Sequence, residues 1–162
     1  MKKIISLFLV LILALIVSGC VGYKPIFQST NVEFKIAEYS IEGDPTLGNK
    51  IYAKLNNITK SLPNDANLKN INIIINTSKE KKPTSKDTAG KILEYRITLN
   101  TKITVTNFSD NNLILDRSFI STANYKVEDQ FSETKKSENK SIEDLIDKTY
   151  QELLIQLSQK IS

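Results

Sequence analysis

Cys20 is the residue whose type and position most clearly predict a chemical event. It is the single cysteine of the 162-residue chain, and it directly follows Ser18 and Gly19. Two small residues let a chain enter a peptidase site in extended form. A lone cysteine beside them suits modification and has no partner for a disulfide. We therefore expect covalent modification of Cys20, with no disulfide and no thiol catalysis.

An export signal precedes Cys20. Residues 1–3 supply two lysines, and residues 4–17 are apolar except for Ser6. This length is typical of the apolar part of a secretory signal, whereas a membrane span needs ~18 residues or more. Together with Cys20, the segment resembles the bacterial lipobox. That resemblance implies cleavage before Cys20, a diacylglycerol on its thiol and an N-acyl lipid on the freed amine.

Lipidation would fix the mature chain to a membrane. Two or more acyl chains anchor stably, because each buried methylene contributes about 0.8 kcal/mol. We accordingly expect a signal peptide at 1–19 and a lipidated tether at 20–30. Val21 stands where enteric bacteria commonly place an Asp to retain lipoproteins at the inner membrane, so the expected location is the periplasmic side of the outer membrane. The alternative is an uncleaved helix through Gly22 in which Cys20 is unmodified.

The rest of the chain offers little for catalysis. It contains no histidine, which excludes imidazole bases, His-based triads and His-ligated zinc or haem. No glycine-rich phosphate loop or serine elbow is present. The candidate acids show no pairing that suits acid–base chemistry or a metal: Glu33, Glu94, Asp116, Glu128 and Asp129. We expect a protein that is not an enzyme, with no catalytic residues, no metal and no cofactor besides the lipid.

The mature chain is close to neutral and of single-domain length. Residues 31–162 can bury one modest core, so we expect one domain there. The full chain has 22 Lys+Arg and 18 Asp+Glu; without Lys2 and Lys3 the balance is 20 against 18, a net charge of +2. No basic run with interleaved aromatic residues occurs, and we expect no nucleic-acid partner.

Alternation and capping signals predict the elements of the first half. Val32, Phe34 and Ile36 alternate with charged residues, which predicts a strand at 31–39. Asp44-Pro45 predicts a helix start, because Asp can accept from free N–H groups and Pro gives up none that the helix needs. The helix is expected to end at Leu62-Pro63, with an apolar stripe of Leu47, Ile51, Leu55, Ile58 and Leu62.

A short apolar strand follows at residues 71–76. Residues 78–91 are charged and aperiodic and contain a proline and a glycine, so we expect a mobile surface loop. The next stretch is the most regular in the chain, because its odd-numbered residues from 95 to 105 are the less polar ones and share one strand face. After turn residues at 109–112, a return strand at 113–127 completes a long antiparallel hairpin.

The C-terminal part ends in a helix. Residues 128–140 are polar and are expected to be loose. Ser141 is the predicted N-cap, with Glu143 and Asp144 near the positive end of the helix dipole. The resulting order of strand, helix, three strands and helix predicts an α+β fold: a two-layer sandwich with a roughly four-stranded, mostly antiparallel sheet and two helices on one face.

Three cations of the hairpin are candidates for binding phosphate. Arg96 and Lys102 lie on the polar face of the first hairpin strand, and Arg117 is on the return strand. A guanidinium binds phosphate through two parallel hydrogen bonds, so these residues could hold a phosphorylated sugar lipid. The alternative is a wet sheet face with scattered cations. By alternation Arg117 falls with Leu115 and Phe119 on the apolar face.

The mature N-terminus and the order of elements resemble a known family. The lipobox cysteine is followed by Gly22-Tyr23-Lys24-Pro25-Ile26-Phe27, then by an early strand and helix, a long hairpin with Arg117, Phe119 and Tyr125, and a closing amphipathic helix. This arrangement is similar to the LPS-assembly lipoprotein LptE family, most of all to its divergent members. Val21, between Cys20 and Gly22, is a departure from their pattern.

The resemblance implies a function. Members of that family plug the lumen of the outer-membrane β-barrel LptD, assist its assembly, and contact lipopolysaccharide (LPS) on its way to the cell surface. Arg96, Lys102 and Arg117 would then be the LPS-binding residues. Two alternatives are an accessory lipoprotein of another ABC-type envelope lipid transport system and, less in keeping with the absence of histidine, a lipid-anchored hydrolase.

Overall fold

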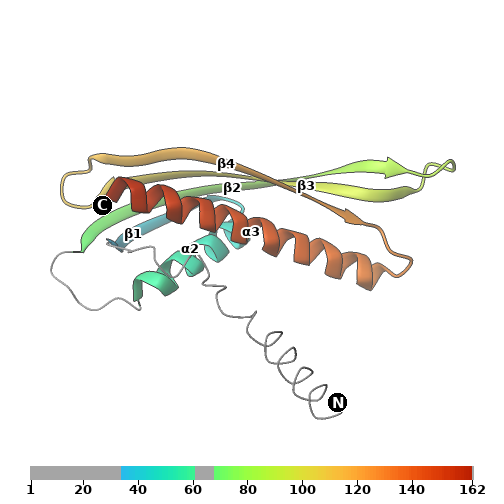
Figure 1. The fold of residues 1–162 in the computed structure, drawn as a ribbon, viewed down its shortest axis with the longest axis horizontal. Coiled ribbons are helices and arrows are strands. Elements are labelled where there is room, and N and C mark those ends of the chain that lie inside the picture. The colour runs from blue at the N-terminus through green and yellow to red at the C-terminus, as the bar shows by residue number, and fades with distance from the viewer. Residues whose placement is uncertain (1–33, 61–67, 162) are drawn as a thin grey trace, which may run out of the picture. The chain divides into compact units, whose positions relative to one another are not determined.

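The computed structural model describes residues 34–60 and 68–161 (Figure 1). The described residues form four strands and two helices in the predicted order. Their bounds are β1 (Phe34–Gly43), α2 (Pro45–Lys60), β2 (Lys69–Lys86), β3 (Ile92–Asn107), β4 (Leu113–Lys126) and α3 (Phe131–Ile161). The predictions for the signal peptide at 1–19, the tether at 20–30, Cys20 and the helix end at Leu62-Pro63 lie outside the described residues.

The four strands form one sheet in the order β1-β2-β3-β4. β1 and β2 are parallel and are joined through α2, whereas β2, β3 and β4 follow one another in antiparallel pairs. A parallel neighbour requires a crossover connection, and here α2 is that connection. The predicted α+β class with a mixed, mostly antiparallel sheet is confirmed.

Helix α2 begins where the sequence predicts. The Asp44 carboxylate caps it, because Asp44 Oδ1 accepts hydrogen bonds from the backbone N–H of Thr46 at 3.0 Å and of Leu47 at 3.2 Å. These bonds satisfy donors that the first turn of a helix leaves free. Of the predicted stripe, Leu47, Ile51 and Leu55 are buried, and Ile58 packs at the edge of the core.

Both helices cover the same face of the sheet (Figure 1). The odd-numbered residues of β2 and β3 point to this face and are buried from Ile71 to Thr77 and from Ile97 to Val105. The even-numbered residues point to the other face, where no helix packs among the described elements. We call this second surface the open face.

The sheet has two unequal halves. The basal half contains β1 and α2 and the larger part of the core. It consists of β1, α2, and residues 69–77, 101–107, 113–119 and 143–161. In the distal half only three strands and the beginning of α3 remain: residues 78–86, 92–100, 120–126 and 131–142.

The mobile loop predicted at residues 78–91 is wrong for most of its length. β2 continues to Lys86 and pairs with β3 from Ser78 opposite Asn100 to Lys86 opposite Ile92, with register shifts on both sides of Ser85. A tight turn held by Asp87 follows: Asp87 Oδ1 accepts from the N–H of Ala89 at 2.9 Å and of Lys91 at 2.8 Å. Residues 78–86 have no apolar alternation of their own, but backbone pairing with β3 makes them a strand.

The predicted loose segment at residues 128–140 and the N-cap at Ser141 are also wrong. Helix α3 starts ten residues earlier, at Phe131, and Ser141 lies in its interior. Residues 131–140 contain no glycine or proline and several Glu and Lys residues, which suits a helix. The Thr134 hydroxyl oxygen accepts from the N–H of Glu128 at 2.8 Å and thereby satisfies a backbone donor just before the helix.

Within residues 34–60 and 68–161, no helix combines the length and the hydrophobicity that a membrane span requires.

Candidate interaction surfaces

The open face is a broad surface of neutral polar side chains. None of its residues on β2, β3 and β4 is buried, and most are Asn, Ser or Thr. The neutral ones include Asn72, Asn76, Ser78, Thr98, Asn100, Thr104, Thr106, Ser118, Thr122 and Asn124. Hydroxyl and amide groups can both donate and accept hydrogen bonds. Such a face can contact a hydrated wall or a carbohydrate without neutralising a charge.

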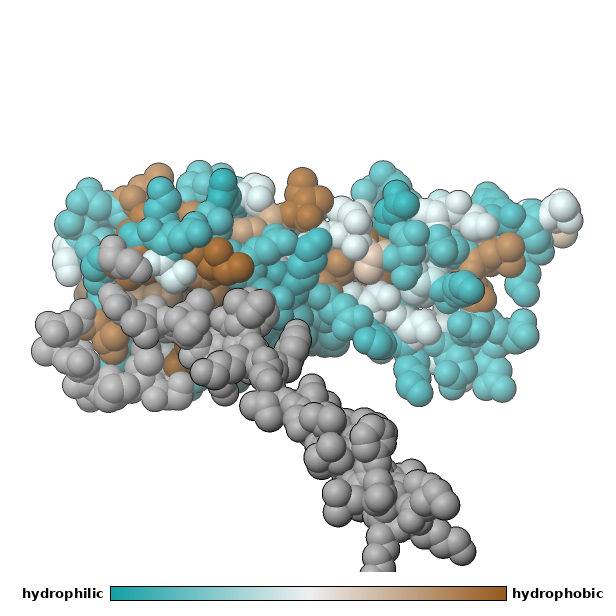
Figure 2. All heavy atoms as spheres, in the orientation of Figure 1, coloured by the Kyte–Doolittle hydropathy of each residue, from teal (hydrophilic) through white to brown (hydrophobic). Residues whose placement is uncertain are grey.

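Isolated apolar side chains interrupt this surface. Ile74 is 41% exposed and Ile120 is 66% exposed on the open face. In the view of Figure 2, apolar side chains of the described residues are scattered among hydrophilic ones. Ile74 and Ile120 lie on different strands, β2 and β4, and most of the side chains around them are neutral and polar.

Arg96 lies on the distal part of the open face, as predicted. Its Nε–H donates to Asn124 Oδ1 at 3.0 Å. The same Asn124 donates through Nδ2 to Glu94 Oε1 at 3.0 Å. Glu94 Oε1 also accepts a hydrogen bond from the Thr84 hydroxyl at 2.7 Å. One edge of the Arg96 guanidinium is therefore engaged in a cross-strand network that reaches Glu94 through Asn124.

Lys102 lies on the same face, six residues along β3 from Arg96. At 3.4 Å per residue the two positions are roughly 20 Å apart. Lys102 Nζ is 3.5 Å from Asp116 Oδ1, which also accepts from the Thr104 hydroxyl at 3.1 Å. The structure therefore places Arg96 and Lys102 on one surface but does not bring them to one binding point.

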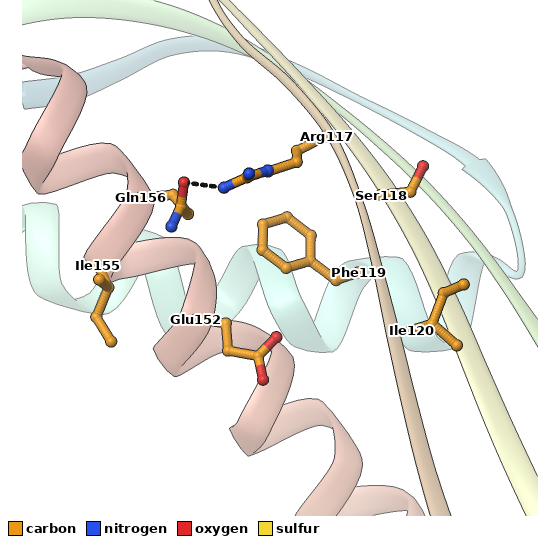
Figure 3. A pocket seen from close by; sticks show the side chains of 7 residues that line it. All are labelled: Arg117, Ser118, Phe119, Ile120, Glu152, Ile155 and Gln156. Atoms are coloured by element: carbon orange, nitrogen blue, oxygen red, sulfur yellow. Dashed lines mark hydrogen bonds between the residues drawn. The ribbon is translucent and has the colours of Figure 1, made fainter.

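Arg117 is separated from the other two cations. Its Cα partner on β3 is Ile103, a buried residue, so its side chain belongs to the helix side of the sheet. There, at the rim, its guanidinium donates to Gln156 Oε1 of α3 (Figure 3). The predicted set of Arg96, Lys102 and Arg117 is thus divided between two surfaces, because alternation along β4 sends Arg117 to the opposite side.

A groove of about 320 Å³ lies between β4 and α3 next to Arg117. Figure 3 shows Phe119 between the two elements, with Glu152, Ile155 and Gln156 on the helix side. Ile155 is 40% exposed there. The carboxylate of Glu152 lies in the same groove as Arg117, so the groove has no net positive charge to attract an anion.

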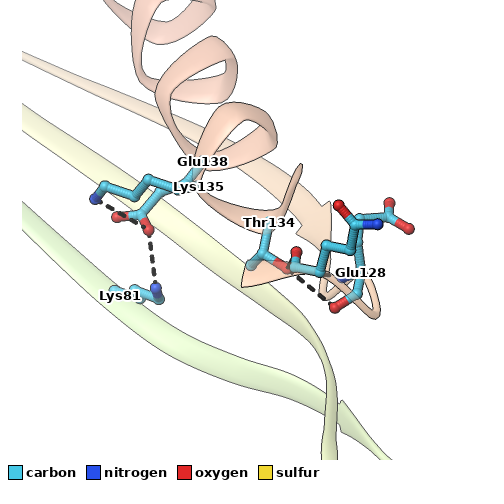
Figure 4. A network of polar contacts seen from close by, with 6 residues as sticks. Lys81, Glu128, Thr134, Lys135 and Glu138 are labelled. Atoms are coloured by element: carbon cyan, nitrogen blue, oxygen red, sulfur yellow. Dashed lines mark hydrogen bonds and ion pairs between the residues drawn. The ribbon is translucent and has the colours of Figure 1, made fainter. Parts of the chain in front are cut away.

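A second cluster, absent from the sequence-based predictions, connects the distal strands to α3 (Figure 4). Lys81 Nζ of β2 is 3.1 Å from Glu138 Oε2 of α3, and Lys135 Nζ is 3.5 Å from the same oxygen. Lys81 also lies over the ring of Tyr95, 4.2 Å from its centroid, and 5.2 Å from that of Tyr125. We call these five residues the distal polar cluster.

Burial and charge act against each other in the distal polar cluster. Burial alone would raise the pKa of Glu138, but the hydrogen bonds and positive charges of Lys81 and Lys135 exceed this effect, so its pKa is lowered from the ordinary value of 4.5. Burial likewise lowers the pKa of Lys81, but Tyr125 and Glu138 outweigh it, so that pKa is raised above 10.5. Both groups are therefore charged across the neutral pH range.

The candidate acids do not assemble into a metal site. Within the described part of the chain, no group of three or more His, Cys, Asp or Glu residues could hold a metal ion. Glu94 and Asp116 bind neighbours on the open face, and Glu128 and Asp129 precede α3. Glu33 and Cys20 lie outside the described residues.

No sequence motif would have identified the distal polar cluster. Lys81 and Glu138 belong to segments whose composition is typical of charged loops. Their ion pair forms only when both segments are ordered. One weak signal existed: the half-apolar alternation of β3 begins at Tyr95, which requires something to cover that ring. Lys81, which is held by Glu138 of α3, lies over that ring.

The chain matches no protein-family model and no curated protein sequence. Its fold is similar to solved structures. One is the uncharacterized lipoprotein B from Nitrosomonas europaea, with a TM-score of 0.59, 19% identity, and coverage of 85% of this chain and 90% of that one. Another is the minor lipoprotein from Acinetobacter baumannii, with a TM-score of 0.52, 16% identity, and coverage of 78% and 93%.

At these identities the likeness concerns the fold. Both proteins are lipoproteins by name, and this chain spans nearly the whole length of each. The four-stranded sheet with two helices on one face is therefore a fold that these two named lipoproteins share.

Proposed function

We propose that this protein is an outer-membrane lipoprotein that plugs the lumen of an LptD-like β-barrel, assists its assembly, and contacts LPS during delivery to the cell surface. Its anchor is the diacylglycerol and N-acyl lipid on Cys20, and its domain faces the periplasm. The proposed role is structural and lipid-contacting, without catalysis.

The open face is the observation that carries this proposal. A plug inside a water-filled barrel must present polar groups to a polar wall, because the interior of such barrels is hydrated. Asn, Ser and Thr side chains meet this need, and the charges between them are largely balanced, as for Lys102 with Asp116. A surface meant for nucleic acid or for a purely anionic membrane would carry an excess of Lys and Arg.

The lipoprotein fold and the predicted anchor support the same location. Acylation at Cys20 would hold the domain at the membrane plane through a short tether. The solved structures with this fold are themselves named lipoproteins. Of the three predicted cations, Arg96 and Lys102 lie on the open face, where they would meet LPS phosphates, whereas Arg117 lies at the helix-side rim beside Glu152.

Co-purification tests the partnership. The chain is tagged at its C-terminus, outer membranes are solubilised in mild detergent, and the proteins that elute with it are identified. We expect a large β-barrel in roughly equal amount, lost on strong denaturation. An ATP-binding cassette transporter or a periplasmic tunnel protein in its place would contradict the plug and move the function to the transport-accessory class.

A separate measurement tests LPS contact. Replacing Arg96, Lys102 and Arg117 together with Gln is expected to weaken LPS binding by the purified lipoprotein, because each charge-assisted contact to phosphate is lost. The matched control replaces Lys50, Lys54 and Lys140 with Gln, since these cations pair with acids of α3 on the helix side. Equal binding by both variants would contradict direct contact through the predicted residues.

A further inference from the structure

Three stretches of strand edge are unpaired within the described residues: the outer edge of β1, which is first in the sheet order, and two further edges on β2 and β4. The edges on β2 and β4 differ in chemistry. One is residues 78–86 of β2, because pairing with β1 ends at Thr77. The other is the whole length of β4, which is last in the sheet order. An unpaired edge offers free N–H and C=O groups to any other strand, so proteins commonly protect it.

The β2 edge carries the usual protection. Four lysines and a proline fall within nine residues: Lys79, Lys81, Lys82, Pro83 and Lys86. Lysine repels an incoming strand of like composition, and proline removes a backbone donor. These residues disfavour pairing of the β2 edge with another strand.

The β4 edge lacks this protection. Over Leu113–Lys126 it has no proline, and its charged residues are Asp116, Arg117 and Lys126. The three most exposed large apolar side chains of the described residues stand on or beside it: Leu113 at 64%, Ile120 at 66% and Phe131 at 82% exposed. They occupy its beginning, its middle and the point where the chain enters α3. An accessible strand edge with apolar side chains along it is typical of a surface that pairs with another strand.

The spacing of these residues fits a second copy of the same strand. When two copies of one strand pair antiparallel about a two-fold axis, the residues that face each other lie equally far before and after the residue on the axis. With the axis at Ser121, Asp116 faces Lys126 of the second copy, and the reverse pair forms by symmetry. Ile120 then faces Thr122, and Leu113 approaches the chain segment that contains Phe131.

We propose that, in the lipoprotein free of a barrel partner, β4 pairs antiparallel with β4 of a second copy, with the axis at Ser121, and joins two sheets into one of eight strands. Two cross-copy ion pairs between Asp116 and Lys126 select this register. A shift of one residue would reverse the faces of the incoming strand, and a shift of two would place Asp116 opposite the neutral Asn124 in one direction or the like-charged Glu128 in the other. In the single copy, Lys102 and Thr104 both engage Oδ1 of Asp116.

The first test measures association of the full-length lipoprotein. The chain is purified from membranes in mild detergent, free of other proteins, and its protein mass is determined by sedimentation over a range of concentrations. We expect a dimer that dissociates on dilution. Ile120→Lys is expected to weaken the dimer about tenfold or more, because it puts charge into the middle of the paired edge. Ile74→Lys, an equally apolar position of the open face on β2, is the matched control and should leave the dimer unchanged.

Charge reversal tests the register itself. Asp116→Lys and Lys126→Asp should each weaken the dimer, because each places like charges opposite one another, and the double variant should restore it. A protein that stays monomeric at every concentration would overturn the proposal. So would a dimer that Ile74→Lys weakens as much as Ile120→Lys, or one that the double reversal fails to restore. Circular dichroism of each variant confirms that the fold is intact, and the reversal pair remains informative if Ile120→Lys fails to fold.

Discussion

In the basal half two helices pack on four strands, whereas in the distal half only the beginning of α3 packs on three. Of the twelve largest fully buried side chains, ten are basal, and the distal half has Ile97 and Leu99. The distal half instead buries part of an ion pair, Lys81 with Glu138, against two tyrosine rings. One half is thus held mainly by apolar burial, and the other depends to a larger degree on polar contacts.

The two halves are therefore held together by different forces. Apolar burial is non-directional and contributes roughly 25 cal/mol per Å², so the basal half can tolerate small shifts. A half-buried ion pair is directional and is costly when one partner is missing. We therefore expect the basal half to set global stability, and the distal polar cluster to decide whether the distal half stays closed.

The largest effect is expected from a cavity in the basal core. Ile75 is fully buried at the centre of β2, and Ile75→Ala should lower the free energy of unfolding by about 2–5 kcal/mol. Urea denaturation followed by far-UV circular dichroism measures the loss. Leu93→Ala, at a distal position that is 41% exposed, is the control and should cost less than about 1 kcal/mol. Similar losses at both positions would contradict the proposed division.

Two glycines with positive φ, one in each half, should differ in the cost of substitution. Gly43, between β1 and α2, has a φ of 72°, and a Cβ there would lie 2.1 Å from the Thr77 carbonyl oxygen. Gly43→Ala should cost at least about 2 kcal/mol, since a close contact adds to the strain of a left-handed residue. Gly90 in the distal turn has a φ of 85° and nothing within 4 Å of a Cβ, so Gly90→Ala should cost about 1 kcal/mol. Equal losses in thermal unfolding would show that the contact at Gly43 relaxes freely.

The two halves also differ in how far the sequence predicts them. Asp44 before Pro45 and the stripe from Leu47 are local signals of the basal half, and the alternation from Tyr95 to Val105 is a local signal that runs through both halves. The structure confirms all three. Local patterns suffice there because each element has an apolar face that can pack in only one direction.

Two segments of the distal half, residues 78–86 and 131–140, escaped prediction because their order is not local, whereas the strands at 92–100 and 120–126 agree with the predicted hairpin. Residues 78–86 become a strand through the backbone of β3, and residues 131–140 extend a helix that has Glu138 to bury beside Lys81. Each segment alone has the composition of a solvated loop. The location of Arg117 could be predicted in part: alternation placed it with Phe119, and its bond to Gln156 on α3 follows from that side of the strand.

A smaller effect is expected from opening the distal polar cluster. Glu138→Ala leaves Lys81 partly buried without its carboxylate and should cost about 1–3 kcal/mol. We expect amide hydrogen exchange to accelerate in residues 78–86 and 131–142, with little change in the basal strands, because the distal half can open by itself. Glu133→Ala, at an exposed position of the first turn of α3, is the control. Acceleration that spreads equally over the whole sheet would mean that the two halves unfold as one unit.

The smallest effect concerns pH. Because the pKa of Glu138 is lowered below 4.5 in the folded protein, its contribution to stability is present above that value and is lost as the pH falls through the folded pKa. The pKa of Lys81 is raised above 10.5, so its contribution is complete below that value and is lost only as the pH rises through the folded pKa. Between these limits the ion pair contributes a constant amount.

Glu138→Gln keeps the size of the side chain and removes its titration. The difference in urea midpoint between wild type and variant should therefore shrink as the pH falls from about 6 to about 3. Ile75→Ala should show no such convergence, because a basal cavity carries no proton. If the Glu138→Gln difference stayed constant across this range, the carboxylate would act in the distal half through its shape and hydrogen bonds, and not through its charge.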